Sequence, residues 1–358
     1  MRIVGADLTI RPAMRFAVTI AGSDPTGGAG LQGDVQVFRA HGVQGGGVVT
    51  ALTAQDGRKV HQVLPVFPSV MLRQMRTLFD AMRPDALKLG MLATDDVARA
   101  VALGLGELAA REGGAPPLVV DPVLAASDGT ALLERRAWPT LLALLRGAAL
   151  VTPNLAEAEA LTGHEAASRA GSERAARALV EEHGAEAALV KGGHREGAPD
   201  DLLAWRDGAG VSLRWLPGER IPGGGAHGTG CALSAAIAAR LALGEPLLAA
   251  VEGARAFVGE ALRRAVGRGG ARFLVLPCTL RRRSRPLRRR STRGAWRTAA
   301  RARRSSPGAT GCSRTPASRR SPPAPRPLSR SSSRRPSRSA GCCRRSWSSS
   351  RCSWPTTG

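Results

Sequence analysis

The sequence predicts an α/β fold with a mainly parallel central sheet that helices cover on both faces. Along residues 16–277, short apolar runs alternate with amphipathic segments of helical length. This alternation is typical of parallel sheets, because a helix usually carries the chain back between parallel strands. Several apolar runs end directly in glycine or polar residues, as in AGSD, KLG, VVDP, VTPN and VKGG. Because ligands bind at the carboxyl ends of such strands, these endings predict a functional site along one rim of the sheet.

The individual elements follow from the spacing of apolar residues. Six short apolar runs are predicted to be buried strands: residues 16–21, 47–50, 86–89, 118–120, 149–152 and 187–190. The amphipathic segments between them are predicted to be helices: residues 31–40, 70–82, 95–110, 132–145 and 172–183. A further Ala-rich helix is expected to begin at Cys231. The order predicts one domain over residues 16–277, preceded by an N-terminal extension at residues 1–15.

The formal net charge of +24 is concentrated in one segment of the chain. Residues 278–358 contain 23 arginines and no Asp, Glu or Lys, which leaves 29 basic and 28 acidic residues in residues 1–277. The α/β part therefore has an ordinary charge balance, and its charge does not indicate a nucleic-acid-binding domain.

The segment 278–358 also lacks Val, Ile, Phe and Met. Such a composition cannot bury enough apolar surface to offset the entropy of ordering the chain. One interpretation is a disordered arginine-rich arm that binds RNA or DNA through phosphate contacts. The other is a GC-rich coding sequence translated in the wrong frame, which the clustered Cys and Trp in GCCRRSW and RCSWP favour. We favour the reading-frame artefact over nucleic-acid binding.

Several classes of protein lack support in the sequence. No apolar run reaches the roughly 18–20 residues that span a bilayer, and the first residues lack the order of a signal peptide. The dinucleotide and P-loop signatures are absent. Cys231 is the sole cysteine before Cys278, which fits a reducing compartment. We therefore expect a cytoplasmic protein that has no membrane partner.

The stretch AHGTGCALSAA joins a glycine-rich turn to the Ala-rich helix. Gly228, Thr229 and Gly230 let backbone amides approach a ligand closely, and the free N–H groups and the dipole of a helix N-terminus favour an anion. This environment suits the negative charge that develops in phosphoryl transfer. A thiol in this place, that of Cys231, is expected to have a lowered pKa. The local sequence is equally compatible with a turn that packs a small buried cysteine.

Polar residues at other strand ends suit a phosphorylated ligand and a cation. Lys88 and Lys191 lie at strand ends in a chain that otherwise prefers arginine, and a compact ammonium suits phosphate. Either could also be an ordinary surface lysine. Asp121, Asn154 and Glu157 supply hard oxygen atoms of the kind that Mg²⁺ prefers. Asn154 also suits a helix cap, and the two roles are compatible.

Taken in order, the motifs AGSDPTGGAGLQGD, TALTAQ, KLGML, VVDPV, VTPNLAEAEAL, VKGGH and HGTGCALSAA resemble those of the hydroxymethylpyrimidine/phosphomethylpyrimidine kinases of thiamine biosynthesis. The resemblance covers about residues 16–274. It implies a three-layer α/β/α fold of the ribokinase-like superfamily, with ATP and Mg²⁺ as co-substrates. It also implies that 4-amino-5-hydroxymethyl-2-methylpyrimidine and then its monophosphate are phosphorylated to give the pyrophosphate.

The resemblance implies roles for individual positions. The implied catalytic set is an anion hole followed by a cysteine, where many ribokinase-like enzymes have an Asp base: Gly228, Thr229, Gly230 and Cys231. The residues expected to contact the aminopyrimidine are Ala29, Asp34, Gln55, Met91 and Val123. The residues expected near the ATP phosphates are Lys191, Asn154 and Glu157, and the expected Mg²⁺ ligands are Asp121 and Glu157.

The resemblance leaves alternatives open. Gly225 and Ala226 stand where the family usually has a polar pair, and Ala232 stands where Thr is common. A pyridoxal or pyridoxine kinase of the same superfamily is the main alternative, although such enzymes often have an apolar residue where Gln55 stands. The superfamily is compatible with a homodimer. Because some relatives are fused to a thiamine-phosphate synthase domain, we interpret residues 278–358 as such a domain read out of frame.

Overall fold

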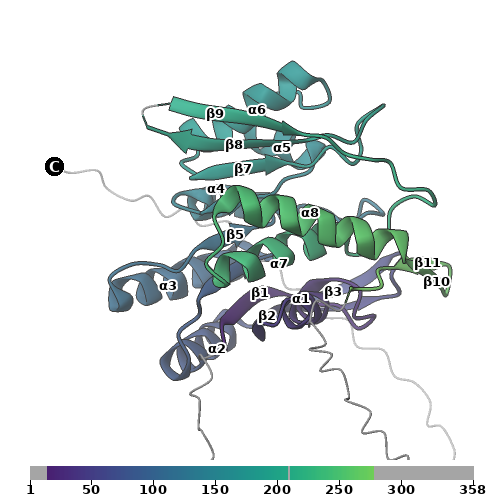
Figure 1. The fold of residues 1–358 in the computed structure, drawn as a ribbon. Coiled ribbons are helices and arrows are strands. Elements are labelled where there is room, and N and C mark those ends of the chain that lie inside the picture. Colours follow the sequence, from purple (N-terminus) through teal and green to yellow (C-terminus); the bar gives the residue numbers. More distant parts are fainter. Residues whose placement is uncertain (1–13, 209, 278–358) are drawn as a thin grey trace, which may run out of the picture. The chain divides into compact units, whose positions relative to one another are not determined.

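The computed structural model describes residues 14–208 and 210–277, which fold around a nine-stranded sheet (Figure 1). The predicted tail at residues 278–358 and residues 1–13 of the predicted extension lie outside the described residues. The strand order is β3-β2-β1-β4-β5-β6-β7-β8-β9. The strands are β1 (Phe16–Ser23), β2 (Gln44–Gln55), β3 (Val60–Pro65), β4 (Ala86–Leu89), β5 (Leu118–Val120), β6 (Leu150–Val151), β7 (Ala187–Val190), β8 (Asp201–Asp207) and β9 (Gly210–Leu216).

Six neighbouring strands of this sheet pair in parallel, namely β2, β1, β4, β5, β6 and β7. Antiparallel strands lie at both edges. Strand β3 pairs antiparallel with β2, while β8 and β9 extend the other edge beyond β7. A separate hairpin of β10 (Val266–Arg268) and β11 (Ala271–Phe273) follows the last helix. The predicted mainly parallel α/β sheet is confirmed.

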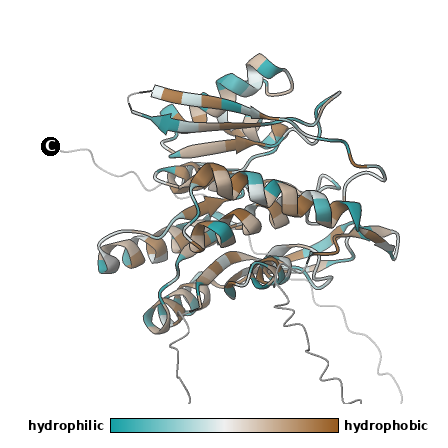
Figure 2. Cartoon of the chain, viewed as in Figure 1, coloured by the Kyte–Doolittle hydropathy of each residue, from teal (hydrophilic) through white to brown (hydrophobic). Residues whose placement is uncertain are grey.

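Helices cover both faces of the sheet and enclose two hydrophobic cores. One core includes side chains of α2 (Pro68–Ala81), α3 (Asp95–Glu112), α4 (Trp138–Leu145), α5 (Leu155–Thr162) and α6 (Arg169–Glu181). The other includes side chains of α1 (Gly30–Ala40), α7 (Thr229–Ala242) and α8 (Leu247–Arg263). Hydrophobic colouring runs through the central strands and α7, and hydrophilic residues appear on the loops (Figure 2). Within the described ranges, no helix is long and apolar enough to cross a membrane.

The predicted elements agree best where a short apolar run is fully buried. The predicted strands 86–89, 118–120 and 187–190 match β4, β5 and β7 to the residue. The helix predicted at 132–145 begins later, at Trp138, after a single 3-10 turn. Leu132 and Leu133 instead donate backbone hydrogen bonds to Leu124, and Pro139 lies in the first helical turn, where its missing N–H costs nothing.

Candidate active site

The carboxyl ends of the parallel strands open onto a cavity of about 1150 Å³. The N-terminus of α7 lines the same cavity. Of the predicted site residues, all but Asp34 contribute to its walls: Ala29, Gln55, Met91, Asp121, Val123, Asn154, Glu157, Lys191, Gly228, Thr229, Gly230 and Cys231. The topology therefore brings one set of residues together from distant parts of the sequence, and their roles toward ligands remain predictions.

The first turn of α7 presents unpaired backbone amides to the cavity. Gly228 precedes the helix with a φ of 79°, in the left-handed region, and its carbonyl accepts from the N–H of Ala232 at 2.8 Å. Within the described chain, the amides of Gly230 and Cys231 have no hydrogen-bond acceptor. The helix begins at Thr229, so the expectation that Cys231 begins it is wrong by two residues. The shift places both free amides inside the first helical turn, where an anion is favoured.

Two glycine-rich loops, one after β1 and one before α7, touch through their backbones. A Cβ atom added to Gly228 would lie 1.9 Å from the carbonyl oxygen of Gly28. A Cβ atom added to Gly28 would lie 2.7 Å from the imidazole of His227. The absence of side chains at both glycines is therefore a condition for bringing the N-terminus of α7 against the loop that precedes α1.

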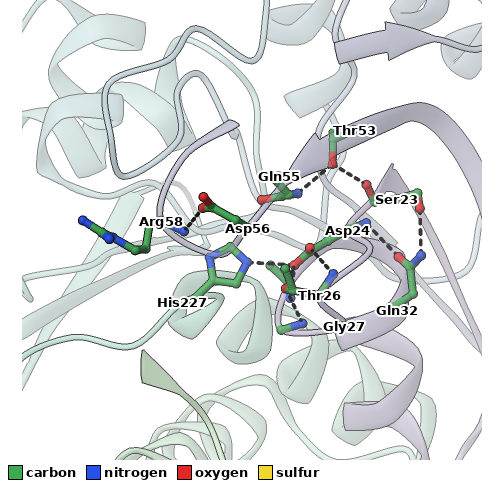
Figure 3. Close-up of polar contacts among 12 residues, drawn as sticks. Ser23, Asp24, Thr26, Gly27, Gln32, Thr53, Gln55, Asp56, Arg58 and His227 are labelled. Atoms are coloured by element: carbon green, nitrogen blue, oxygen red, sulfur yellow. Dashed lines mark hydrogen bonds and ion pairs between the residues drawn. The ribbon is translucent and has the colours of Figure 1, made fainter. Parts of the chain in front are cut away.

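A hydrogen bond between two side chains joins the same two loops (Figure 3). Nε2 of His227 lies 2.7 Å from Oδ2 of Asp24, which also accepts from the hydroxyl of Thr26 and the amide of Ala29. Burial opposes ionisation of Asp24, but the hydrogen bonds from His227 and Thr26 outweigh it and lower the pKa of this carboxyl. Because an ionised carboxylate can only accept, Nε2 of His227 carries the proton.

Lys191, Asp121 and Glu157 form a buried cluster of charges beside the first turn of α7. Nζ of Lys191 lies 2.9 Å from Oδ1 of Asp121 and 3.9 Å from Oε2 of Glu157. A Cβ atom added to Gly230 would lie 3.3 Å from the same Nζ. Burial disfavours the ammonium, but the two carboxylates outweigh it and raise the pKa of Lys191 to about 12. A positive charge therefore lies next to the free amides of α7.

Asn154 and Glu157 form a reciprocal cap at the start of α5. The Asn154 side chain accepts from the N–H of Glu157 at 2.9 Å, and Oε2 of Glu157 accepts from the N–H of Asn154 at 2.7 Å. This capping box satisfies two amides that would otherwise lack partners. Burial raises the pKa of Glu157 to about 7, and Lys191 offsets this only in part.

Cys231 faces the cavity as a protonated thiol at neutral pH. Burial raises the pKa of Cys231 to about 11, and the nearby ammonium of Lys88 lowers it only in part. The direction is opposite to that expected for a thiol at a helix N-terminus. The loss of hydration on burial disfavours the thiolate, and the nearby carboxylates of Asp121 and Asp34 add to this effect.

Asp34 lies beneath the cavity in a buried ion pair with Lys88. Both side chains are fully buried, with Nζ of Lys88 2.8 Å from Oδ2 of Asp34. The hydroxyl of Thr19 donates to the same oxygen at 2.6 Å, and Oδ1 of Asp34 is buried without a partner within the described chain. Asp34 raises the pKa of Lys88 and outweighs the effect of burial, so this lysine stays charged. The predicted contact between Asp34 and a pyrimidine remains a prediction, since the carboxylate does not line the cavity.

The wall near β2 combines an amide with apolar side chains. Gln55 ends β2 and lines the cavity. Met91 and Val123 pack in a small apolar cluster at the same wall, and Ala29 lies at the start of α1. These residues come from four segments that follow or end strands. Gln55 reaches the rim because β2 extends to residue 55, five residues beyond the predicted strand.

The loop between β7 and β8 lines the cavity on the side of α8. Residues that follow β8 or belong to α6 hold this loop in place. Nη2 of Arg220 donates to the carbonyl oxygen of Arg195 at 2.6 Å. The guanidinium of Arg195 lies 5.3 Å from the ring centroid of Trp215, and that of Arg169 lies 4.0 Å from the same centroid. The loop is therefore tied to β9 through the contact of Arg195 with Trp215.

Two residues of the site were missed by sequence reasoning. Asp24 and His227 occur inside the quoted motifs AGSD and AHGTGC, but their separation of 203 positions gave no sign that they pair. A polar residue directly after a buried strand was the available signal for Asp24. For His227 the available signal was its place directly before the glycine turn.

The fold and the cavity place the protein in the class of small-molecule kinases with a ribokinase-like fold. A structure of Bacillus subtilis pyridoxal kinase in an ADP complex superimposes with a TM-score of 0.66 and 30% identity, over 74% of this chain and 98% of that one. A structure of phosphomethylpyrimidine kinase from Clostridium difficile 630 gives a TM-score of 0.60 and 32% identity, over 69% of this chain and 99% of that one.

The chain belongs to the phosphomethylpyrimidine kinase family, whose sequence pattern matches residues 24–275. A relative from Rhizobium meliloti (strain 1021), named hydroxymethylpyrimidine/phosphomethylpyrimidine kinase, is 43% identical over 252 residues, which are 70% of this chain and 91% of the relative. The family suggested by the ordered motifs is therefore confirmed.

Replacing Lys88 by methionine is expected to lower the free energy of unfolding by about 3–5 kcal/mol, because Asp34 would stay buried with an unpaired charge. Urea denaturation followed by circular dichroism measures the change. Lys59→Met is the matched control, since Lys59 is exposed and surface substitutions usually stay within about 0.5 kcal/mol. A Lys88→Met protein as stable as the wild type would contradict a structural role for the buried pair.

Glu157 is expected to make stability depend on pH. Its pKa in the folded protein, about 7, lies above its ordinary value of 4.5, so its contribution is fully present below pH 4.5 and is lost as the pH rises through 7. Glu157→Gln stays neutral and keeps an oxygen acceptor for the cap. The stability of the wild type relative to this variant should fall by up to about 3 kcal/mol over this range.

Urea denaturation at several pH values, with EDTA present, measures this difference. Glu159→Gln on the exposed side of α5 is the control and should show no such trend. Parallel pH profiles for the wild type and Glu157→Gln would show that burial does not raise this pKa.

Proposed function

We propose that the protein transfers the γ-phosphoryl group of ATP to the hydroxymethyl oxygen of 4-amino-5-hydroxymethyl-2-methylpyrimidine, and then phosphorylates the monophosphate to the pyrophosphate in thiamine biosynthesis. The observation that carries the proposal is the pair of free amides at Gly230 and Cys231 beside the Lys191 ammonium. They lie in the same cavity as an amide, Gln55, and an apolar wall that suits a small methylated ring. The names of the family and of its relatives agree with this chemistry.

The residues of the rim would work by positioning and by charge. As the bond from the hydroxymethyl oxygen to the γ-phosphorus forms and the bond to the β–γ bridging oxygen breaks, negative charge lies on the phosphoryl oxygens and on departing ADP. The amides of Gly230 and Cys231 would donate to these oxygens, and Lys191 would stabilise the same charge. Because they are fixed before the reaction, the site spends little free energy on reorganisation.

Cys231 is a poor candidate for a general base. With a pKa of about 11, its thiol is protonated near neutral pH and cannot take the proton of the hydroxymethyl group. A largely dissociative transition state needs little base catalysis. We therefore assign the backbone of this residue, rather than its sulfur, the larger share in stabilising the transferred group.

We also propose that Mg²⁺ accompanies ATP near Asp121 and Glu157. Both carboxylates line the cavity, yet Asp121 already accepts from Lys191 and Ser234, and Glu157 accepts from the amide of Asn154. Among the residues described, no three His, Cys, Asp or Glu side chains are arranged to hold an ion. This donor set fits a cation that phosphates and water hold in large part. Bound there, it would neutralise charge on the nucleotide.

A homodimer is the assembly we propose, on the basis of an exposed apolar surface near the β2–β3 edge. Leu52 and Leu64 face each other across the two strands and are about half exposed. Phe67 and Val70, at the start of α2, are also exposed. Apolar side chains gathered in this way are typical of contact surfaces between chains.

Pyridoxal phosphorylation is the second candidate, because the structure of a pyridoxal kinase superimposes well on this fold. Steady-state kinetics with ATP and each of the two vitamins separates the candidates. We expect kcat/KM to be higher for the aminopyrimidine, because Gln55 offers an amide to its polar edge. Equal or better turnover of pyridoxal would overturn the proposed function.

Substitutions in the first turn of α7 should separate the backbone from the thiol. Gly230→Asp should lower kcat by at least about 10²-fold, because a carboxylate would displace the anion from the amides. Cys231→Ala should lower kcat by no more than about 10-fold, since loss of a true general base costs roughly 10²–10⁴-fold. The kinase assay measures both, with circular dichroism as a check on folding. A Cys231→Ala loss above 10²-fold would identify the thiol as an essential base.

A further inference from the structure

Strand β2 directs two polar side chains toward the cavity, Thr53 and Gln55, which lie two residues apart and so on the same side of the strand. The hydroxyl oxygen of Thr53 makes two short contacts. It lies 2.8 Å from the carbonyl oxygen of Ser23 and 2.8 Å from the side-chain amide of Gln55 (Figure 3).

Thr53 has a single hydroxyl proton, and this fixes the orientation of the Gln55 side-chain amide. A carbonyl oxygen can only accept, so the single hydroxyl proton of Thr53 is committed to Ser23. The hydroxyl oxygen then acts as an acceptor toward Gln55, and the group that faces it has to be the Nε2–H. The reversed amide would leave two oxygen atoms facing each other without a proton between them.

Ser23, whose carbonyl accepts from Thr53, is itself fixed by neighbouring groups. The hydroxyl of Ser23 accepts from Nε2 of Gln32 at 2.7 Å, and Oε1 of Gln32 accepts from the N–H of Asp24 at 2.8 Å. Ser23 also belongs to β1, which pairs with β2. The carbonyl that orients Thr53 is therefore part of the rigid rim.

Because Nε2 of Gln55 donates to Thr53, the side-chain carbonyl oxygen of Gln55 is left to face the cavity. Figure 3 shows Oε1 turned away from Thr53, and this oxygen has no hydrogen-bond partner among the residues described. One N–H of Nε2 also remains free. A carbonyl oxygen beside an N–H complements a ring edge that carries an amino group next to a ring nitrogen, as glutamine does with adenine.

We propose that Thr53 is a specificity-determining positioning residue, which turns the Gln55 amide so that the site selects a ring with an exocyclic amino group. The inference rests on the proposed pyrimidine substrate. Thr53 acts through Gln55 and does not itself have to touch the ring. Without its hydroxyl, the Gln55 amide could turn over and present an N–H to the amino group, which would repel it.

Calorimetric titration of the full chain tests the proposal with two probes, 4-amino-5-hydroxymethyl-2-methylpyrimidine and the same compound without its 4-amino group. The wild type should bind the amino compound more tightly. Thr53→Val should reduce this preference by about 10-fold, mainly by raising the Kd of the amino compound. Thr53→Ser keeps a hydroxyl and should keep the preference within about 3-fold.

Two controls separate orientation from folding. Thr162→Val removes a hydroxyl that donates to Ala158 within α5, and it should leave the preference unchanged. In a Gln55→Ala background, Thr53→Val should have no further effect, because coupled residues are not additive. A general loss of folding would instead weaken binding of both probes in either background.

The outcomes distinguish the role of Thr53 from the proposed function. If Thr53→Val weakens both probes equally, changes neither, or adds to Gln55→Ala, the role assigned to Thr53 is wrong. If the wild type prefers the amino compound but does not phosphorylate it with ATP, the proposed function fails while the role of Thr53 stands. If the wild type binds neither pyrimidine, both fail.

Discussion

The contact between the backbones of Gly28 and Gly228 is the constraint on which the rest of the site depends. The room between them is smaller than one methyl group, since a Cβ atom on Gly228 would lie 1.9 Å from the carbonyl of Gly28. Gly228 also adopts a left-handed conformation that other residues rarely take. The contact sets where α7 begins relative to β1, and thereby where its free amides lie relative to Gln55. The hydrogen bond of His227 with Asp24 holds the same junction through side chains.

Paired charges surround the position proposed for the transferred phosphoryl group. Lys88 is fully buried and Lys191 is mostly buried, and each has a carboxylate at hydrogen-bonding distance. Pairing makes it possible to keep ammonium groups charged away from water, which isolated burial would prevent. Lys88 pairs with Asp34, which lies outside the cavity wall, whereas Lys191 lies beside the amides. The sequence showed both lysines at strand ends in a chain that prefers arginine, but it could not show which of them lies beside the amides of α7.

The sequence predicted the fold where apolar runs are buried on both sides, as in β4, β5 and β7. It missed the β8–β9 hairpin, although the residues of β9 alternate between apolar and polar, and it missed α8, where Gly253 and Gly259 weaken the helical sequence pattern. Nearly all of the expected site residues lie together, because the carboxyl ends of parallel strands lie side by side whatever their separation in sequence. The sequence could not predict how deeply each side chain is buried. Asp34 lies below the cavity rather than at its wall, and burial reverses the pKa shift expected at Cys231, because both depend on packing by distant segments.

The stacking of Arg195 on Trp215 gives the protein an optical reporter of its own. The guanidinium groups of Arg169 and Arg195 lie 4.0 Å and 5.3 Å from the ring centroid of Trp215, and its indole N–H donates to Glu173 at 2.8 Å. Three charged side chains therefore contact this indole. Arg195 belongs to the loop that borders the cavity on the side of α8, whereas Trp215 belongs to the edge of the sheet. Because indole fluorescence responds to nearby charge and to water, any displacement of that loop changes the emission of a residue that does not itself touch the cavity.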